Sequence, residues 1–216
     1  IPYSILGKVV EGGRLKASFK GETVVDLPAE LVARAPIIKR KARKPKSLEA
    51  KINMPRPPKP ENLEVVFLRL LGSQNIACRS WVYRQYDHEV GVRTVVKPGD
   101  GDAAVLRIPE AGRAIAVTFD ANSRHSALDP FHGHAGGLAE AARNLACVGA
   151  EPLAYTDCCN FGNPEKPEVF WQFKRGVEGL AYMSKGLGIP CVGGNVSFYN
   201  EDEETGLAVK PTTTIV

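Results

Sequence analysis

Residues 156–165 read TDCCNFGNPE and residues 190–200 read PCVGGNVSFYN, and an amphipathic helix pattern lies between the two stretches. Each stretch contains or follows a short apolar run, so we expect one strand that ends before Asp157 and a second, over 189–192, that ends before paired glycines. A helix that joins two parallel strands brings the loops after both strands to the same edge of one sheet. Open α/β sheets bind ligands at that edge, and we therefore expect a nucleotide phosphate and a metal ion there.

The first loop contains three oxygen-bearing side chains, Asp157, Asn160 and Asn163. Mg²⁺ takes carboxylate, amide and phosphate oxygens and usually keeps several waters, which suits such a loop. In the second loop, Gly193-Gly194 permits positive φ and leaves no side chain between backbone N–H groups and a phosphate. Asn195 then offers an amide oxygen to the metal, and Ser197 offers a hydroxyl to a substrate. Spacing alone leaves a plain turn open, because asparagine also favours turns that bind no ligand.

Other classes of nucleotide and catalytic site are not supported. Neither loop carries a Walker A signature or a Gly-x-Gly-x-x-Gly fingerprint, which argues against a P-loop and a Rossmann fold. No Ser/His/Asp or Cys/His arrangement stands out, and we assign no catalytic residue. The five cysteines show no Cys-x-x-Cys pair and no zinc-type spacing, so we expect small buried thiols in a reducing compartment.

Several polar features keep two interpretations each. Asp120 follows an expected strand over 114–119 and either reaches a metal or caps the next loop. His132 and His134 are two residues apart, so a regular helix would not let them share one metal, whereas a loop would. Gly133 lies near the start of the helix expected from the segment 129–137. It permits either an anion to bind at the N-terminus of that helix or close packing of the helix on its neighbours. The roles of these residues stay open at this point.

Periodicity supplies the remaining elements. Apolar residues recur at helical spacing over 63–71, from the segment 129–137 to about Val148, and after Pro167 as far as Leu187. Short β-rich runs lie at 5–10, 15–19, 23–27, 103–108, 114–119 and 212–216. The order of these elements predicts an α/β or α+β layer domain over 103–197.

The bulk composition is that of a globular protein, with 44% hydrophobic and 24% charged residues among 216. No apolar run reaches the roughly 18 residues that cross a bilayer, and the N-terminus lacks a signal-peptide pattern, so we expect a cytoplasmic protein without a membrane partner. Residues 34–59 contain ten Lys and Arg but only one acidic residue, Glu49. The same segment contains five prolines. The prolines favour an extended, solvated linker over a nucleic-acid-binding arm. The start at Ile1 and the end in a β-rich run at Val216 indicate a segment of something longer.

Both motifs resemble those of a known enzyme family. The sequence TDCCNFGNPEKPE (156–168), followed by GGNVSFYN (193–200), is similar to phosphoribosylformylglycinamidine synthase. In purine synthesis, that family uses ATP to convert formylglycinamide ribonucleotide to its amidine with ammonia from glutamine. Supporting matches are WVYRQYDH (81–88), GDAAVLR (101–107) and AEAARNL (139–145), so the resemblance spans roughly residues 63–216.

The resemblance implies a fold and a domain order. The family's synthetase is a tandem duplication of an aminoimidazole ribonucleotide synthetase-like N-terminal domain, and each copy is followed by a C-terminal domain. An α+β layer domain with a mixed sheet and packed helices is implied over 61–216, as the second N-terminal-type, ATP-site domain. Residues 1–33 would then end the first, β-rich C-terminal-type domain, and residues 34–60 would form a basic, Pro-rich linker.

The resemblance also implies roles for single residues. Asp157 and Gly194 would contact ATP. Asn195 would bind Mg²⁺, and Ser197 would contact the ribonucleotide substrate. The family's catalytic histidine belongs to the first N-terminal-type domain, so the chain would be part of an ATP-dependent C–N ligase and inactive alone. The stretch His132-Gly133-His134 departs from the family's more common Tyr/Gly/Gly-like sequence, which argues against catalysis there.

The implied partners are the missing domains of the same synthetase, a glutaminase subunit or domain, and formylglycinamide ribonucleotide, without nucleic acid. An alternative is non-enzymatic: a structural or nucleotide-binding half whose sheet packs against its duplicated partner. A third interpretation is a nucleic-acid module that uses residues 34–59. Titration with Mg·ATP distinguishes the first two, and salt-sensitive DNA binding with and without the basic segment tests the third.

Overall fold

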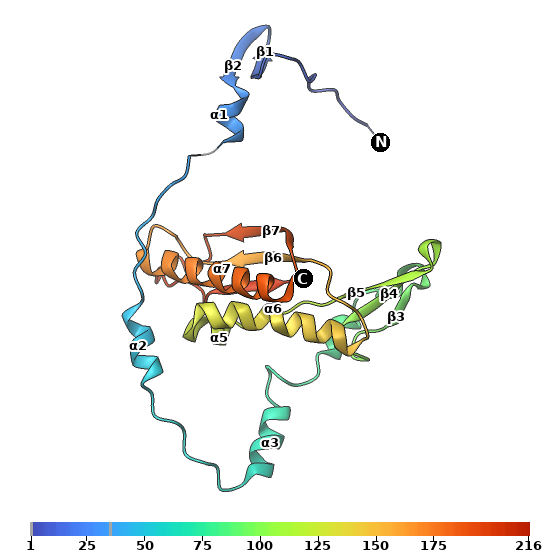
Figure 1. Ribbon diagram of the computed structural model, residues 1–216, viewed down its shortest axis with the longest axis vertical. Coiled ribbons are helices and arrows are strands. Elements are labelled where there is room, and N and C mark those ends of the chain that lie inside the picture. Colours follow the sequence, from blue (N-terminus) through green and yellow to red (C-terminus); the bar gives the residue numbers. More distant parts are fainter. Residues whose placement is uncertain (1, 35) are drawn as a thin grey trace. The chain divides into compact units, whose positions relative to one another are not determined.

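The computed structural model describes residues 2–34 and 36–216. The chain divides into two units, Ile1–Lys39 and Arg40–Val216 (Figure 1). The expectation attached to the start at Ile1 lies outside the described residues. The finer limits expected from the sequence, with boundaries after 33 and after 60, stay a prediction.

The first unit is a β-hairpin with a short helix after it. Strand β1 (Arg14–Phe19) pairs antiparallel with β2 (Glu22–Pro28), and helix α1 (Ala29–Ala33) follows directly. Lys20 and Gly21 form the turn with φ of 50° and 89°, as a two-residue hairpin turn of this kind requires. The two strands confirm the expectations from the sequence.

The strand expected over 5–10 is wrong. Those residues form neither helix nor strand, and their side chains are exposed. A favourable composition alone does not make a strand, because backbone N–H and C=O groups need a neighbouring strand to pair with. The described sheet of this unit consists of β1 and β2.

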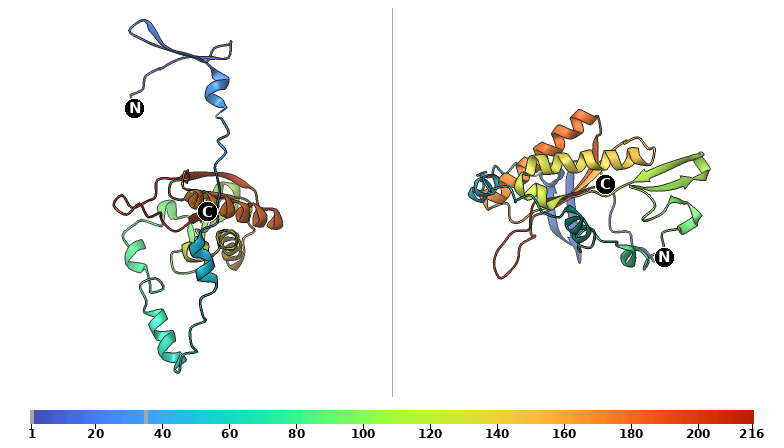
Figure 2. Two further views of the ribbon diagram at one scale, coloured as in Figure 1. Left: turned by 90° about the vertical axis from the view of Figure 1, so that its left-hand side faces the viewer. Right: turned by 90° about the horizontal axis from the view of Figure 1, so that it is seen from below.

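The second unit contains a sheet covered by two long helices. Strand β6 (Tyr155–Asn160) lies between parallel β7 (Cys191–Ser197) and antiparallel β8 (Thr212–Ile215). Helix α7 (Pro167–Leu187) joins β6 to β7, which confirms the expected strand–helix–strand unit. Helix α6 (Pro130–Cys147) lies beside α7 (Figures 1 and 2). This mixed sheet with packed helices is the layer architecture that the sequence predicts.

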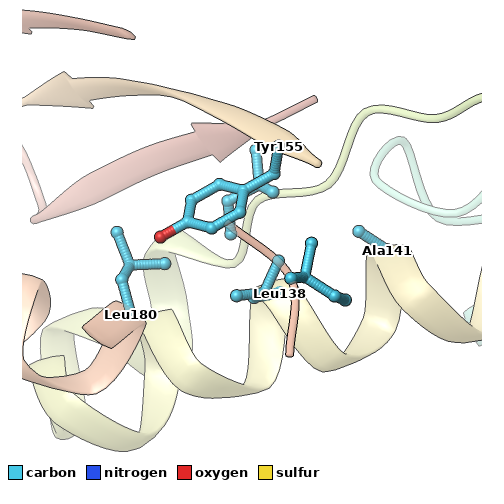
Figure 3. Packing of buried hydrophobic residues seen from close by; sticks show 6 residues of the cluster. Leu138, Ala141, Tyr155 and Leu180 are labelled. Atoms are coloured by element: carbon cyan, nitrogen blue, oxygen red, sulfur yellow. The ribbon is translucent and has the colours of Figure 1, made fainter. Parts of the chain in front are cut away.

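The helices and the sheet enclose the main core. Figure 3 shows Tyr155 reaching from β6 toward the helices, where Leu138, Ala141 and Leu180 lie. Tyr155 is 6% exposed, and burial of such apolar surface, at about 25 cal/mol per Å², holds both helices on this face of the sheet. Gly133 lets α6 approach the preceding helix, because a Cβ there would overlap the Ser126 backbone. Gly133 thus serves close packing.

A second sheet precedes this layer in the chain. Its strands β3 (Thr94–Val96), β4 (Ala104–Ile108) and β5 (Arg113–Val117) pair antiparallel in that order. The remaining helices are α2 (Lys46–Ile52), α3 (Leu63–Leu71), α4 (Ser80–Tyr83) and α5 (Ser123–Leu128), with 3₁₀ turns at Val90–Val92 and Pro109–Ala111. The sequence predicts β4, β5 and α3, but β3 and α5 have three and six residues, too few for a periodic pattern. In the described parts of the chain, no helix has the length and apolar character needed to cross a bilayer.

Strands β6 and β7 extend further toward their C-terminal ends than the sequence predicts. Strand β6 includes Asp157 and runs to Asn160, and β7 runs through the paired glycines to Ser197. The expected ends, before Asp157 and at 192, are therefore wrong. An apolar run does not mark the limits of a strand, because backbone pairing continues where side chains are polar or face solvent. In β7, all residues before Ser197 are exposed.

Part of the expected linker packs on the second unit. Pro45 is buried, and Leu48 is 2% exposed. Arg43 N donates to Pro167 O over 3.0 Å, and the Arg43 guanidinium lies 3.5 Å from the Glu168 carboxylate. The expectation of a solvated connector is thus wrong at Pro45 and Leu48, whereas residues 41–44, 46 and 47 are exposed. Proline content predicts an extended backbone, but a single leucine and a backbone hydrogen bond are enough to dock that backbone on a neighbouring surface.

Candidate functional site

Strands β6 and β7 bring the four predicted ligand-binding residues onto one strand pair. The opposed pairs are Asp157 with Gly194, Cys158 with Asn195, and Asn160 with Ser197. A β-bulge sets this register: between the paired residues Cys191 and Gly193, Val192 has no partner of its own on β6. The predicted residues therefore lie close together, as expected, but they belong to the two strands rather than to the loops that follow them.

The four residues nevertheless lie on two faces of the sheet. Tyr155 and Cys159 are buried in the apolar clusters that the helices form, and Asp157 lies midway between them in β6. Strand alternation therefore places the Asp157 side chain on the same, helix-covered face. Gly194 stands opposite Asp157 and shares its face. Asn195 and Ser197 lie one and three residues further along β7, so strand alternation places them on the other face of the sheet. Asn195 also lines the hollow beside Asp157, so the two faces meet at the outer edge of β7, where one ligand can contact both.

On the helix-covered face, Asp157 borders a hollow of about 300 Å³. The lining is largely apolar and includes Cys159, Phe173, Val177 and Val196. Burial raises the pKa of the Asp157 carboxyl above its usual range, because apolar surroundings disfavour the charged form. A carboxyl in such a hollow suits a ligand group that is flat and apolar but carries a hydrogen-bond donor.

Gly194 makes room for this carboxyl. A Cβ at Gly194 would overlap Asp157 Oδ1 and would lie 2.7 Å from the Asp157 carbonyl oxygen. At Gly193, the nearest neighbour of such a Cβ, Thr156 Cγ2, is 3.9 Å away. Neither glycine has positive φ, so the left-handed backbone expected of the paired glycines is wrong. Gly194 is required for close approach between strands rather than for an unusual backbone conformation.

On the opposite face, three polar side chains form a row. Asn195 Nδ2 donates to Ser197 Oγ over 3.2 Å, and Ser197 Oγ donates to Tyr199 Oη over 3.5 Å. Ser197 is 8% exposed, whereas Asn195 is exposed. Within the described chain, no group donates a hydrogen bond to Asn195 Oδ1. That amide oxygen is therefore available to a cation or a water.

The asparagines at the end of β6 and in the loop after it make local hydrogen bonds. Asn160 Nδ2 donates to Cys158 O over 2.9 Å, and Asn163 Oδ1 accepts from Glu165 N over 2.9 Å. The Asn163 oxygen thus closes a turn, which is the ligand-free interpretation that the spacing left open. A role for this oxygen at a metal stays a prediction.

A second loop, between β7 and β8, holds the first loop in place. Glu201 Oε1 accepts from Asn163 N over 2.8 Å, and Glu201 Oε2 lies 2.7 Å from Lys166 Nζ. Lys166 Nζ also donates to Gly206 O over 2.8 Å. Sequence reasoning missed Glu201 and Lys166. The available signal was an acid directly after the motif at 193–200 and a lysine inside the motif at 156–168.

Asp120 anchors the fold. Its carboxylate accepts from Asn144 Nδ2 over 2.9 Å and from Thr118 Oγ1 over 3.1 Å, and its backbone pairs with Ile215. The residue is 9% exposed. These contacts tie the end of β5 to α6 and β8, and the cap of the next helix is Asn122 rather than Asp120.

The two histidines at the start of α6 do not form a metal site. His132 Nδ1 lies 2.7 Å from Asp129 Oδ2, and Asp129 Oδ1 accepts from Phe131 N and His132 N, so this carboxylate caps the helix. His134 is 2% exposed, its Nδ1 donates to Pro130 O over 2.7 Å, and burial lowers its pKa. Its Nε2 is buried without a partner among the described residues. The described residues contain no cluster of three or more His, Cys, Asp or Glu that suits a metal.

A family model for AIR synthase related protein, N-terminal domain, matches residues 100–216. The match runs from β4 to β8 and includes the whole β6–β7 strand pair. The chain belongs to this family. Membership of the AIR synthase related family confirms the α+β layer fold that the sequence predicts.

Curated relatives match the whole chain. Phosphoribosylformylglycinamidine synthase subunit PurL of Methanothermobacter thermautotrophicus is 48% identical over 215 residues, which cover 100% of this chain and 29% of the relative. The subunit of the same name from Methanothermobacter marburgensis is 50% identical over 215 residues, with the same shares of both chains. These relatives confirm the resemblance seen in the motifs. The chain spans about 29% of their length.

Solved structures from Thermotoga maritima share the architecture of this AIR synthase related chain. PurLQS matches with a TM-score of 0.73 and 28% identity, over 96% of this chain and 32% of that chain. PurL complexed with ATP matches with a TM-score of 0.67 and 26% identity, over 96% and 31%. PurL complexed with FGAR matches with a TM-score of 0.67 and 27% identity over the same shares.

Proposed function

We propose that this chain is part of an ATP-dependent C–N ligase of purine biosynthesis. The reaction joins ammonia from glutamine to formylglycinamide ribonucleotide and gives formylglycinamidine ribonucleotide. The main support is 48% identity over the whole chain to a PurL subunit, in a chain whose β6–β7 pair aligns the candidate ligand residues. Thermotoga maritima PurL has been solved with ATP and with FGAR, the substrates such a ligase requires besides ammonia. A cytoplasmic location goes with this function.

In this proposal, Asp157 and Gly194 contact ATP. The hollow beside Asp157 takes the flat part of the nucleotide, whose hydrogen-bond donors meet the carboxyl. Gly193 and Gly194 leave the adjoining edge of β7 free of side chains, so the ligand can pass from one face to the other. Backbone N–H groups on an exposed strand edge add donors for phosphate oxygens.

We further propose that Asn195 binds Mg²⁺ and that Ser197 contacts the ribonucleotide substrate. The strand residues that share the face of Asn195 carry no carboxylate, and Asn195 Oδ1 accepts no hydrogen bond in the described chain. Mg²⁺ commonly takes one or two protein oxygens and completes its shell with phosphate and water, so this oxygen fits the ion once ATP is bound. When bound, the ion neutralises charge on the transferring phosphoryl group.

The chain then supplies one wall of a larger active site. In the proposed reaction, ATP phosphorylates the amide oxygen of the substrate and ammonia displaces the phosphate. We assign no catalytic residue to this chain, and the remaining groups come from other domains of the synthetase and from a glutaminase partner. We therefore expect the purified chain to make no product from formylglycinamide ribonucleotide, ATP and ammonium. Turnover by the chain alone would contradict this division of roles.

A non-catalytic half-domain is the second candidate function, and the exposed residues of β7 favour it because they offer a sheet surface to a duplicated partner. Calorimetric titration of the 216-residue chain with Mg·ATP separates the two. We expect binding by the wild type and by Asp100→Ala, an exposed aspartate of another loop, and binding weakened about tenfold or more by Asp157→Ala and by Asn195→Ala. Equal binding by all four proteins would remove these residues from the site. Binding by none would favour the structural half.

A further inference from the structure

The ends of β6 and β7 are joined beyond the candidate site by a compact set of hydrogen bonds. Phe161 N donates to Ser197 O over 2.9 Å, and Asn200 N donates to Phe161 O over 3.2 Å. Asn200 Nδ2 donates to Phe161 O over 3.2 Å and to Ser197 O over 3.1 Å. The carbonyl oxygen of Ser197 is thus held by both loops that leave the strand pair.

Glu201 closes this set of contacts. One carboxylate oxygen accepts from Asn163 N over 2.8 Å, and the other pairs with Lys166 Nζ at 2.7 Å. Lys166 in turn donates to Gly206 O over 2.8 Å. A single side chain therefore holds the backbone of the β6–α7 loop and, through Lys166, the far side of the β7–β8 loop.

The fit around Glu201 is close. The Glu201 side chain is 19% exposed, and a Cβ at Gly162 would lie 2.5 Å from Glu201 Oε1 and 2.6 Å from Ala208 Cβ. Glycine at 162 is thus the point where the second loop rests on the first. Hydrogen bonds from Lys166 and Asn163 hold the pKa of Glu201 below its usual range, so the carboxylate is charged near neutral pH.

We propose that Glu201 is a positioning residue: by locking the β6–α7 loop against the end of β7, it fixes Ser197 and, through it, Asn195, the proposed ligand of the Mg²⁺ that accompanies ATP. The path is short, because Phe161 adjoins Gly162 in the locked loop and bonds directly to Ser197, whose hydroxyl accepts from Asn195. The inference rests on the proposed function for the identity of the ligand. The lock itself stands on the distances above.

The test uses the 216-residue chain with Glu201→Ala, Glu201→Gln and a matched control, Glu110→Ala. Glu110 pairs with Arg93 at 2.5 Å beside the separate β3–β5 sheet, so its loss removes a more exposed ion pair away from the site. Three quantities are measured: hydrogen exchange at the Asn163 amide, the Kd for Mg·ATP, and the thermal midpoint. Glutamine keeps an oxygen acceptor for Asn163 N and loses only the charge.

We expect Glu201→Ala to accelerate exchange at Asn163 about tenfold or more, because the amide loses a charged acceptor, and to weaken Mg·ATP binding by a similar factor. Glu201→Gln should restore most of the protection and of the affinity. Glu110→Ala should leave both unchanged and lower the thermal midpoint by less than Glu201→Ala does, because the Glu110 side chain is 65% exposed and exposed ion pairs contribute little to stability.

The outcomes are distinguishable. Unchanged exchange at Asn163 in Glu201→Ala would refute the lock, whatever the nucleotide result. Faster exchange with unchanged affinity would reduce Glu201 to a loop staple and overturn the positioning role, while the proposed function would stand. A wild-type chain that does not bind Mg·ATP would overturn the proposed function and, with it, the nucleotide role of Glu201.

Discussion

Replacing Gly194 by alanine should disrupt the β6–β7 strand pair, whereas the same change at Gly193 should be tolerated. A Cβ at 194 would overlap Asp157 Oδ1, approach Asp157 O to 2.7 Å and approach Asp157 Cγ to 3.0 Å. A Cβ at 193 would have its nearest neighbour at 3.9 Å. Neither glycine has positive φ, so backbone strain does not separate the two variants. Adjacent residues of one exposed strand thus form a matched pair.

The magnitudes follow from the two situations. Forcing an extra carbon into an occupied space typically costs roughly 1–3 kcal/mol of stability. Gly→Ala at an unstrained, open position instead stabilises by roughly 0.4–1 kcal/mol, mainly because the unfolded chain loses freedom. We therefore expect Gly194→Ala to be less stable than Gly193→Ala by about 1.5–4 kcal/mol. The Asp157 carboxyl can rotate away but the backbone oxygen cannot, so adding Asp157→Ala should restore only part of the loss.

Urea unfolding of the 216-residue chain, followed by circular dichroism, measures the stabilities, and titration with Mg·ATP measures the site. Gly194→Ala should weaken nucleotide binding even under conditions where the variant is fully folded, because the new methyl group displaces the Asp157 carboxyl. Equal stability of the two alanine variants would refute the close approach of Gly194 to Asp157. Equal affinity would remove that approach from the proposed ATP site.

Three further predictions concern the rest of the second unit. Burial lowers the pKa of His134 in the folded chain, so as the pH falls the unfolded chain protonates this imidazole before the folded chain does. The unfolding free energy should therefore be at its full value above about pH 6.5 and should decrease below that pH; urea titrations at several pH values should show this slope, and His134→Asn should flatten it. Burial raises the pKa of the Cys159 thiol to about 11, whereas the Ser80 hydroxyl lowers that of exposed Cys78, so mass spectrometry should find iodoacetamide on Cys78 first and on Cys159 last; similar rates would contradict the burial of Cys159. Leu48→Ala should lower the unfolding free energy by about 2 kcal/mol or more and speed tryptic cleavage in the basic segment 39–51. Ser47→Ala, at an exposed neighbour, should change neither, and unchanged cleavage in Leu48→Ala would mean that this segment is not docked.

The sequence predicted the strand–helix–strand unit because its helix is long and strongly periodic. The apolar face of α7 meets the sheet at Leu180, and its first turn carries Pro167, so both the type and the start of the helix follow from local chemistry. The motifs that flank this helix also predicted which residues meet on the strand pair. Asp157 does stand opposite Gly194.

The strand limits and the two-faced arrangement could not be predicted. Asp157 and Asn195 are polar and therefore look like loop residues, but backbone pairing with neighbouring strands holds both in place. Which face each residue occupies depends on the bulge at Val192, and no local pattern in an exposed strand indicates a bulge. The docking of residues 40–48 escaped prediction for a similar reason, since it depends on a surface more than a hundred residues further along the chain.

The bulge at Val192 also determines where this strand pair can change in length. Deletion of Val192 would turn the bulge into regular pairing and leave Gly194 opposite Asp157, so insertions and deletions at this point are compatible with the site. Loss of one residue between 193 and 197 would instead turn part of the strand over and carry Ser197 to the helix-covered face. Among natural variants of this chain, gaps should therefore fall at 192 and be rare in the five positions after it.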